Sequence, residues 1–437
     1  MDPRPSRRAV LRSAAGAAGA ALSLEPLSPF ALARGPRPVR AGFVGVGGRG
    51  TGLLATMLDI EGVEVPAVCD IEPAHAARAS GVLTGAGRAA PELYTAGEYA
   101  YEDLMARDDL DAVIIATPWH WHTPMAVCAM KNGKYAGVEV PAAISLEQCW
   151  ALVDTSEETG VPCMMLENWS FRRDNLALLR MVRAGLFGRI VHCHAAHSHD
   201  CIDHWFFTAE TGADRWGAEY LLAYNRDQYP THGLGPVLSW LDVNVGDRFA
   251  SVTSSATGSF GINAYFARRF GADHPSAKRK YAQGDIVTST IRTARGKTLV
   301  VNYDMQLPRP YDNRWMLQGT LGIYDEERAA VYLTGRSPEY HQWEPFAPYQ
   351  EEFDHPWWTG GLAAGGHGGV DGLELRLFVA AVRDGAQTPL DVYDSATMSA
   401  LVALSGLSIE RNGAPVEWPD FTRGRWEERR PTFAVVP

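Results

Sequence analysis

The sequence predicts an α/β protein of two domains, in which a doubly wound parallel sheet precedes an α+β domain with an open, mostly antiparallel sheet. Two observations predict the first domain. A glycine-rich turn joins an apolar run to a helical pattern, and strand-like runs alternate with helical runs as far as residue 166. The second domain is predicted because strand-like runs joined by short turns dominate the later chain. We therefore assign residues 34–166 to the first domain and residues 167–437 to the second.

The elements of the first half follow from apolar runs of strand length and from the helical periodicity between them. Strands are expected at 40–46, 63–69, 111–117, 135–140 and 161–166, with helices between them that include 124–131 and 146–159. In such a sheet, ligands bind at the carboxyl ends of the strands.

The second half begins with a helix expected at 175–184 and a strand at 190–196, followed by a loop rich in histidine and tryptophan. Further strands are expected at 250–257, 285–293, 298–304, 315–322 and 330–334, and a late helix at 370–383. Short turns between consecutive strands favour antiparallel pairing.

The glycine-rich turn has the spacing Gly-x-Gly-x-x-Gly, formed by Gly45, Gly47 and Gly50. In a Rossmann domain the first glycine permits the tight turn, the second lets the backbone approach a pyrophosphate, and the third lets the helix pack on the strand. The next apolar run ends at Asp70, where a carboxylate can bind a ribose 2′-hydroxyl and would repel a 2′-phosphate. The sequence thus predicts a Rossmann domain that binds NAD.

The composition is that of an ordinary globular protein, 46% hydrophobic and 21% charged, with a net charge of −11. This charge argues against a basic surface, so nucleic acid and anionic membranes are not expected partners. The six cysteines have neither Cys-x-x-Cys nor zinc spacing and are expected to be free core thiols. The oligomeric state is left open, a homo-oligomer included.

Residues 1–33 are predicted to be a twin-arginine-type signal peptide. Arg7 and Arg8 precede a mildly apolar, alanine-rich run, and Ala31-Leu32-Ala33 suits cleavage. We therefore expect a periplasmic or secreted protein that is exported folded, with a disordered arginine-rich N-terminus as the alternative. No other stretch reaches about 18 uninterrupted apolar residues, so no transmembrane span is expected.

Beyond the glycine turn, Ala116-Thr117-Pro118 with His122 and Glu139-Val140-Pro141 resemble the Gfo/Idh/MocA family of sugar and inositol oxidoreductases. In dehydrogenases of that family the last motif is usually Glu-Lys-Pro, and its lysine serves the hydride chemistry, whereas this chain has Val140. A narrower resemblance is carried by Trp119-x-Trp121-His122, Glu167-Asn168, Pro308-Arg309-Pro310-Tyr311 and the run Tyr229-Pro230-Thr231-His232-Gly233-Leu234-Gly235-Pro236. These motifs resemble glycoside hydrolase family 109, whose members are NAD-dependent α-N-acetylgalactosaminidases, often with twin-arginine signals.

The resemblance implies two sets of site residues. Together with the three glycines of the turn, the cofactor would be bound by Gly48, Arg49, Asp70, Trp119, His120, Trp121, His122, Glu139, Val140 and Asn168. The sugar would be bound by His197, Arg215, Tyr229 and Thr231, with His232 and Tyr311 as the catalytic residues.

The chain departs from the family pattern at three places. His120 stands where glutamate is usual, and His197 stands where a sugar-binding tyrosine is expected. The spacing from Arg215 to His232 is also slightly longer than usual. The substrate preference can therefore differ from that of the family.

The residue types fit these roles, and each also has a structural alternative. His232 can project into a cleft as a general acid or base, or serve as a capping or core histidine. Tyr311 can donate or accept a proton, or fill the core. Trp119 and Trp121 can flank a nicotinamide or simply pack, and Asn168 can bind the cofactor ribose or cap the following helix.

Two further groups are left outside the assigned site. His192, His194, His197 and His199 alternate and could bind a divalent metal, but sheet surface is favoured for the first pair, so no metal site is assigned. His367 and Asp371 flank a helix start, where substrate contact and N-capping are both open.

Oxidation at C3 of a sugar explains why a hydrolase would need NAD. The C3 ketone makes the C2 proton acidic, the C1 aglycone leaves by elimination, water adds to the enone, and retained NADH reduces C3 again. This route needs no flanking carboxylate pair, and the sequence offers no obvious one. Together with this chemistry, the resemblance to glycoside hydrolase family 109 implies a glycosidase that removes terminal α-linked N-acetylgalactosamine from a glycan or glycoside. The alternatives are a periplasmic NAD-dependent sugar or inositol dehydrogenase and a non-catalytic, NAD-retaining sugar-binding protein.

Overall fold

The computed structural model describes residues 37–435, so the expected signal peptide at 1–33 lies outside the described residues. The first sheet has six strands in the order β3-β2-β1-β4-β5-β6, and all neighbours are parallel. These strands are β1 (Val39–Val44), β2 (Val63–Cys69), β3 (Glu92–Tyr94), β4 (Ala112–Ile115), β5 (Tyr135–Val138) and β6 (Cys163–Met165). The predicted doubly wound parallel sheet is confirmed.

Helices connect these strands, and the chain order creates a ligand site. The helices are α1 (Gly48–Leu58), α2 (Pro73–Gly85), α3 (Ala100–Met105), α4 (Trp119–Lys131) and α5 (Leu146–Thr159). Helix α4 begins before the expected start at Pro124, which lies inside the helix. Strands β1 and β4 are neighbours, but the chain continues from them toward opposite edges of the sheet. Their carboxyl ends therefore border the crevice in which sheets of this kind bind ligands.

The second sheet has nine strands in the order β14-β13-β12-β11-β7-β10-β9-β8-β15. Neighbours are antiparallel except β7 and β10, which confirms an open, mostly antiparallel sheet. The strands are β7 (Ile190–Ser198), β8 (Phe249–Ala256), β9 (Ile286–Thr293), β10 (Thr298–Asp304), β11 (Met316–Gly319), β12 (Gly322–Asp325), β13 (Ala330–Leu333), β14 (Glu344–Pro345) and β15 (Val416–Glu417).

The single strand expected at 315–322 was wrong, because this segment forms the hairpin of β11 and β12. The apolar pattern runs across the turn, yet Leu321 is 44% exposed. Glycines flank the turn because main-chain atoms approach closely. A Cβ on Gly319 would lie 2.1 Å from the carbonyl oxygen of Phe187, and one on Gly322 would lie 2.5 Å from that of Tyr332.

The later chain also contains helices and short helical turns, several of which place the functional residues. They are η1 (Asn168–Phe171), α6 (Arg173–Arg183), η2 (Ile202–Phe206), α7 (Ala218–Ala223), α8 (Thr231–Leu241), α9 (Gly261–Phe270), α10 (Pro275–Lys278), α11 (Ala347–Glu352), α12 (Pro356–Thr359), η3 (His367–Gly369), α13 (Val370–Asp384), α14 (Val392–Glu410) and η4 (Arg425–Glu427). Turn η1 contacts both α8 and α13, and α13 also packs against α1 and β1. The segment that follows β6 is thus held between both halves of the fold.

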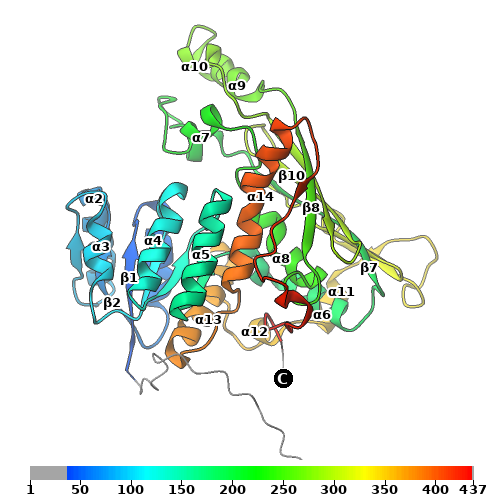
Figure 1. Ribbon diagram of the computed structural model, residues 1–437, viewed down its shortest axis with the longest axis horizontal. Helices are drawn as coiled ribbons and strands as arrows, with labels where there is room; N and C mark the ends of the chain where they lie inside the picture. Colours follow the sequence, from blue (N-terminus) through cyan, green and yellow to red (C-terminus); the bar gives the residue numbers. More distant parts are fainter. Residues whose placement is uncertain (1–36, 436–437) are drawn as a thin grey trace, which may run out of the picture. The chain divides into compact units, whose positions relative to one another are not determined.

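Helix α14 is the one described helix that is long and apolar enough to cross a membrane by length and composition. Most of its apolar stretch is buried, and it lies between α5 and β8 (Figure 1). Its serine hydroxyls accept hydrogen bonds from main-chain amides of neighbouring elements, Ser395 from Met165 and Ser408 from Ser254. These contacts are those of a core helix.

All six cysteines lie in the described part of the chain and are free thiols, as expected. Five are buried, and Cys128 is half-buried.

Candidate functional site

The glycine turn after β1 has the close contacts that its spacing predicts. Gly45 has a φ of +80°, and a Cβ on it would lie 2.6 Å from the carbonyl oxygen of Ala116 at the end of β4. A Cβ on Gly50 would lie 1.9 Å from the carbonyl oxygen of Gly45, so only glycine lets α1 approach the strand. A Cβ on Gly48, the first residue of α1, would meet no atom within 4 Å. Open space therefore faces the start of the helix, where main-chain amides bind phosphates.

A cavity of about 640 Å³ lies at this crevice. Its wall includes Gly45, Gly47, Gly48, Arg49, Asp70, Trp119, Trp121, His122, Glu139 and Val140, which brings together most of the predicted cofactor residues. Asp70 is nearly buried and accepts hydrogen bonds from the amides of Val46 at 2.8 Å and Glu72 at 2.9 Å. The glycine cradle supplies main-chain donors for a pyrophosphate, and this carboxylate supplies an acceptor for a free ribose 2′-hydroxyl, as binding of an adenine dinucleotide requires.

The four side chains at the start of α4, from Trp119 to His122, have different surroundings. The Trp119 ring is buried against Trp205, Trp216, Tyr220 and Tyr229, so it packs and also lines the cavity. Trp121 packs against the edges of Tyr99 and Tyr101. His122 is buried, and its two ring nitrogens lie 2.7 Å from the carbonyl oxygens of Pro141 and Thr117, so it braces two strand ends. His120 points toward Tyr220 instead and lines neither cavity.

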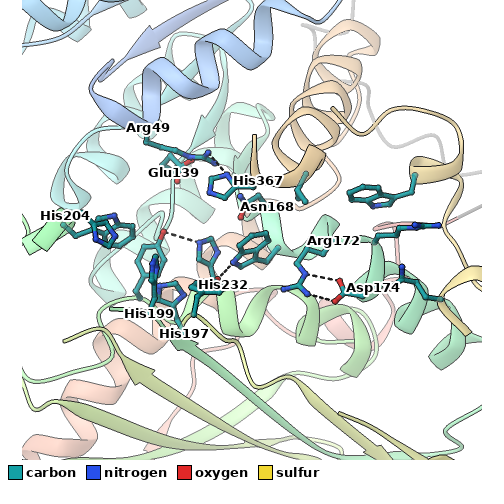
Figure 2. Close-up of a pocket in the computed structure, with 18 residues that line it drawn as sticks. Arg49, Glu139, Asn168, Arg172, Asp174, His197, His199, His204, His232 and His367 are labelled. Carbon is teal, nitrogen blue, oxygen red and sulfur yellow. Dashed lines mark hydrogen bonds and ion pairs between the residues drawn. The ribbon is translucent and has the colours of Figure 1, made fainter. Parts of the chain in front are cut away.

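A second cavity, of about 790 Å³, adjoins the first. We call it the sugar cavity, and the first one the cofactor cavity. The two share Arg49, Glu139, His204, Trp205 and Tyr229 in their walls. Figure 2 shows Arg49, Glu139 and His367 on one side of the sugar cavity and His197 and His199 on the other, with His232 between them. A ligand in the sugar cavity would therefore lie next to one in the cofactor cavity.

His232 lies in the first turn of α8, which begins at Thr231. Its Nδ1 donates a hydrogen bond to Oε2 of Glu167 at 2.8 Å. The Glu167 side chain is 0% exposed, and its Oε1 accepts from the amide of Trp169 at 3.0 Å, so it also caps η1. A Cβ on Gly235 would lie 2.6 Å from Cγ of Glu167, so a glycine in α8 makes room for this carboxylate.

Two tyrosines flank His232. The Tyr229 hydroxyl lies 3.4 Å from Nε2 of His232, and burial, followed by the charges of Glu139 and Glu167, raises the pKa of Tyr229 well above its usual value. Tyr311 is 37% exposed and accepts a hydrogen bond from Nε1 of Trp169. Burial of its hydroxyl likewise raises the pKa of Tyr311, so both phenols keep their protons at neutral pH.

A second histidine–carboxylate pair faces the same cavity from α13. His367 donates from Nδ1 to Oδ2 of Asp371 at 2.8 Å, and Arg49 donates to both oxygens of that carboxylate at 2.7 and 3.2 Å. Nδ2 of Asn168 also donates to Asp371, at 2.9 Å. Burial opposes ionisation of Asp371, but the hydrogen bonds from His367, Arg49 and Asn168 outweigh it and hold its pKa well below the usual value.

Two carboxylates among the described residues line the sugar cavity, and each is paired with an arginine. Glu139 accepts from Nε of Arg49 at 2.6 Å, and Asp174 accepts from Nε of Arg172 at 3.0 Å. Neither carboxylate is left free to attack a sugar.

The remaining predicted residues are placed as follows. His197 is buried in the wall of the sugar cavity, and its ring lies 4.8 Å from that of Tyr229. Arg215 lines the cofactor cavity and donates to the carbonyl oxygen of His204, so its sugar contact stays a prediction. Thr231 is buried and lines neither cavity. Asn168 lines the sugar cavity, and Glu167, not Asn168, caps the following turn.

The structure brings to the site four residues for which the sequence predicts no specific role. They are Glu167, Trp169, His367 and Asp371. The one local signal was the position of Glu167 directly after a buried strand, where polar groups of a parallel sheet meet ligands.

Two family models match this chain, one in its first part and one in its later part. The family described as oxidoreductase family, NAD-binding Rossmann fold, matches residues 39–167, and glycosyl hydrolase 109, C-terminal domain, matches residues 171–428. A glycosyl hydrolase family 109 protein from Saccharopolyspora erythraea is 41% identical and covers 98% of this chain and 96% of its own length. An α-N-acetylgalactosaminidase from Tannerella forsythia is 41% identical over 91% of this chain and 89% of its own. Among solved structures, an NAD-binding oxidoreductase from Klebsiella pneumoniae shares the fold, with a TM-score of 0.67 at 17% identity over 88% of this chain and 99% of its own.

Proposed function

The chain belongs to the glycosyl hydrolase 109 family, and from this premise we propose that it removes terminal α-linked N-acetylgalactosamine by an NAD-dependent redox cycle. The substrate is inferred from the named activity of the Tannerella forsythia relative. The observation that carries the mechanism is the shared wall of the two cavities, with His232, Tyr229 and Tyr311 in the sugar cavity beside it.

The residues of the cofactor cavity fit NAD. The glycine turn and the start of α1 would hold the pyrophosphate, and Asp70 would hold the adenosine ribose. When bound, NAD supplies a hydride acceptor for C3 of the sugar and a donor that later restores it.

His232 is the proposed base for the C2 proton. Because Nδ1 keeps its proton and donates a hydrogen bond to Glu167, the neutral ring has a lone pair at Nε2, the nitrogen that faces Tyr229. That nitrogen can accept the C2 proton, and the buried carboxylate then stabilises the positive ring.

Tyr311 is proposed as a hydrogen-bond or proton donor to a sugar oxygen, because its raised pKa makes it a poor base. His367 is oriented by Asp371 toward the same cavity and offers a second proton-transfer group for the departing aglycone. The arginine-paired carboxylates favour this route over direct displacement at C1, which requires a free carboxylate beside the anomeric carbon.

A panel of nitrophenyl glycosides, assayed without added cofactor, tests the function. The α-N-acetylgalactosaminide should release nitrophenol while the net absorbance of NADH changes little, and denatured protein should release NAD. Accumulation of NADH in proportion to substrate consumed would instead identify a sugar or inositol dehydrogenase. A sugar-binding protein would give neither signal.

We further propose that the enzyme is exported to the periplasm or outside the cell, because Arg7 and Arg8 suit export of a folded, cofactor-loaded protein. Replacing both arginines by lysine should trap the precursor in the cytoplasm. Normal amounts of mature periplasmic protein from that variant would contradict the targeting assignment.

A further inference from the structure

We propose that His197, His199 and Cys201 form a binding site for a divalent transition-metal ion, best suited to zinc, in the wall of the sugar cavity. This inference does not rest on the proposed glycosidase activity. The three residues lie at the end of β7 and just after it, and one potential ligand atom from each side chain lies within 4.8 Å of the others.

The main chain holds the three residues in this arrangement. After β7 ends at Ser198, the amide of His199 donates to the carbonyl oxygen of Asp304 at 2.9 Å, and that of Cys201 donates to the carbonyl oxygen of Met305 at 3.0 Å. The segment is therefore fixed to the end of β10. Bonds that position a backbone before a ligand arrives reduce the entropy lost on binding.

The imidazole of His197 lacks the partners that a buried polar group normally has. Its Nδ1 and Nε2 are both buried, and neither has a hydrogen-bond partner within the described residues 37–435. Buried side-chain nitrogens are bonded in the large majority of structures, so this exception requires an explanation. Coordination of a metal ion satisfies one nitrogen with a strong partner.

The charges around the cluster suit a cation. The carboxylates of Asp200 and Asp203 both lie close enough to Cys201 to interact with it electrostatically, and they would attract a cation.

The donor set favours zinc. Two imidazole nitrogens and one thiolate are borderline ligands of the kind that zinc binds, whereas calcium and magnesium prefer oxygen. Zinc binds cysteine as the thiolate, so binding at Cys201 would release the thiol proton to solvent.

One coordination position would face the sugar cavity. His197 and His199 both line that cavity, whereas Cys201 does not, so a metal ion held by the two imidazoles would adjoin it. Three protein ligands with a fourth, open position are the arrangement of catalytic zinc sites. A metal here would give His197 a role that the tyrosine expected at this position does not have.

Metal analysis of the NAD-loaded, full-length enzyme tests the proposal. Protein grown with zinc and dialysed against metal-free buffer should retain about one zinc per chain. Cys201→Ala and His199→Gln should each weaken zinc binding by about tenfold or more, since even the loss of a partner outside the ligand set costs that much. Cys193→Ala, which removes another buried thiol of β7, should leave binding unchanged.

Cobalt provides a readout that does not depend on activity. Wild-type protein loaded with cobalt should show the near-ultraviolet charge-transfer absorption of a cobalt–thiolate bond, and Cys201→Ala should lose it. Folded, NAD-containing wild type with neither zinc nor that absorption would overturn the proposal. So would zinc binding that is unaffected by both ligand variants. Neither outcome bears on release of nitrophenol, so the metal site and the proposed glycosidase can fail separately.

Discussion

Exchange of Glu167 for glutamine tests how the proposed base is held in place. Glutamine keeps the size of the side chain, and its amide oxygen can still accept from the amide of Trp169, as Oε1 of Glu167 does at 3.0 Å. The NH₂ group then faces Nδ1 of His232, where the carboxylate stood 2.8 Å away. Nδ1 must accept in that arrangement, so the proton moves to Nε2 and the nitrogen facing Tyr229 loses its lone pair.

The expected decrease in kcat follows from the charged hydrogen bond that the variant loses. A hydrogen bond to a charged group contributes about 1.5–3 kcal/mol. Since about 1.4 kcal/mol corresponds to a tenfold change in rate, Glu167→Gln should lower kcat by roughly 10- to 150-fold. KM should change little, because Glu167 lies behind His232 and does not line the sugar cavity.

Steady-state kinetics on nitrophenyl α-N-acetylgalactosaminide, with bound NAD quantified in each preparation, gives the required comparison. Glu157→Gln is a matched control, since Glu157 is on α5, pairs with Arg423 and Arg425 and lines neither cavity. Its kcat should equal that of wild type. A wild-type kcat for Glu167→Gln would refute the reasoning, as would a loss confined to KM.

Two further predictions concern the cofactor turn and the second carboxylate. Gly50→Ala should abolish NAD retention, because its Cβ would meet the main-chain oxygen of Gly45 at 1.9 Å, whereas Gly52→Ala meets nothing and should stabilise α1 by about 0.5–1 kcal/mol. The nucleotide released on denaturation measures NAD retention, and the thermal midpoint measures stability. NAD in the Gly50→Ala variant would contradict the turn geometry. The depressed pKa of Asp371 means that its stabilisation is present above the unfolded pKa of about 4 and is lost as pH falls below it. Thermal midpoints between pH 7 and pH 3 should therefore fall less steeply in Asp371→Asn than in wild type, and parallel curves would show that Asp371 is not the group responsible.

The first sheet could be predicted from the sequence because its signals are local. Strands such as β4 are short apolar runs buried on both faces, and the glycine turn has a spacing that steric contact dictates. Helix α14 gave no comparable signal. Its apolar residues point in every direction because it is surrounded by α5, α8 and β8, so no periodic face marks it.

The site was only partly predictable, because several of its contacts join residues that are far apart in the sequence. A motif that spans the start of α8 identified Tyr229 and His232, which are close in sequence and lie together in the structure. The carboxylate partner of His232 is 65 positions away, and the Arg49–Asp371 pair spans 322 positions. No local spacing encodes such pairs, because they depend on how η1 and α13 pack against α8 and α1.

Loss of deuterium from C2 tests the redox mechanism most directly. If cleavage proceeds through a 3-keto sugar, a C2-deuterated N-acetylgalactosaminide must exchange its label with water while it is bound, and His232→Ala should suppress both exchange and turnover by about a hundredfold or more. The product N-acetylgalactosamine from wild-type enzyme should therefore carry hydrogen at C2. Full retention of deuterium in product released by a fully active enzyme would contradict the account and leave direct displacement at C1.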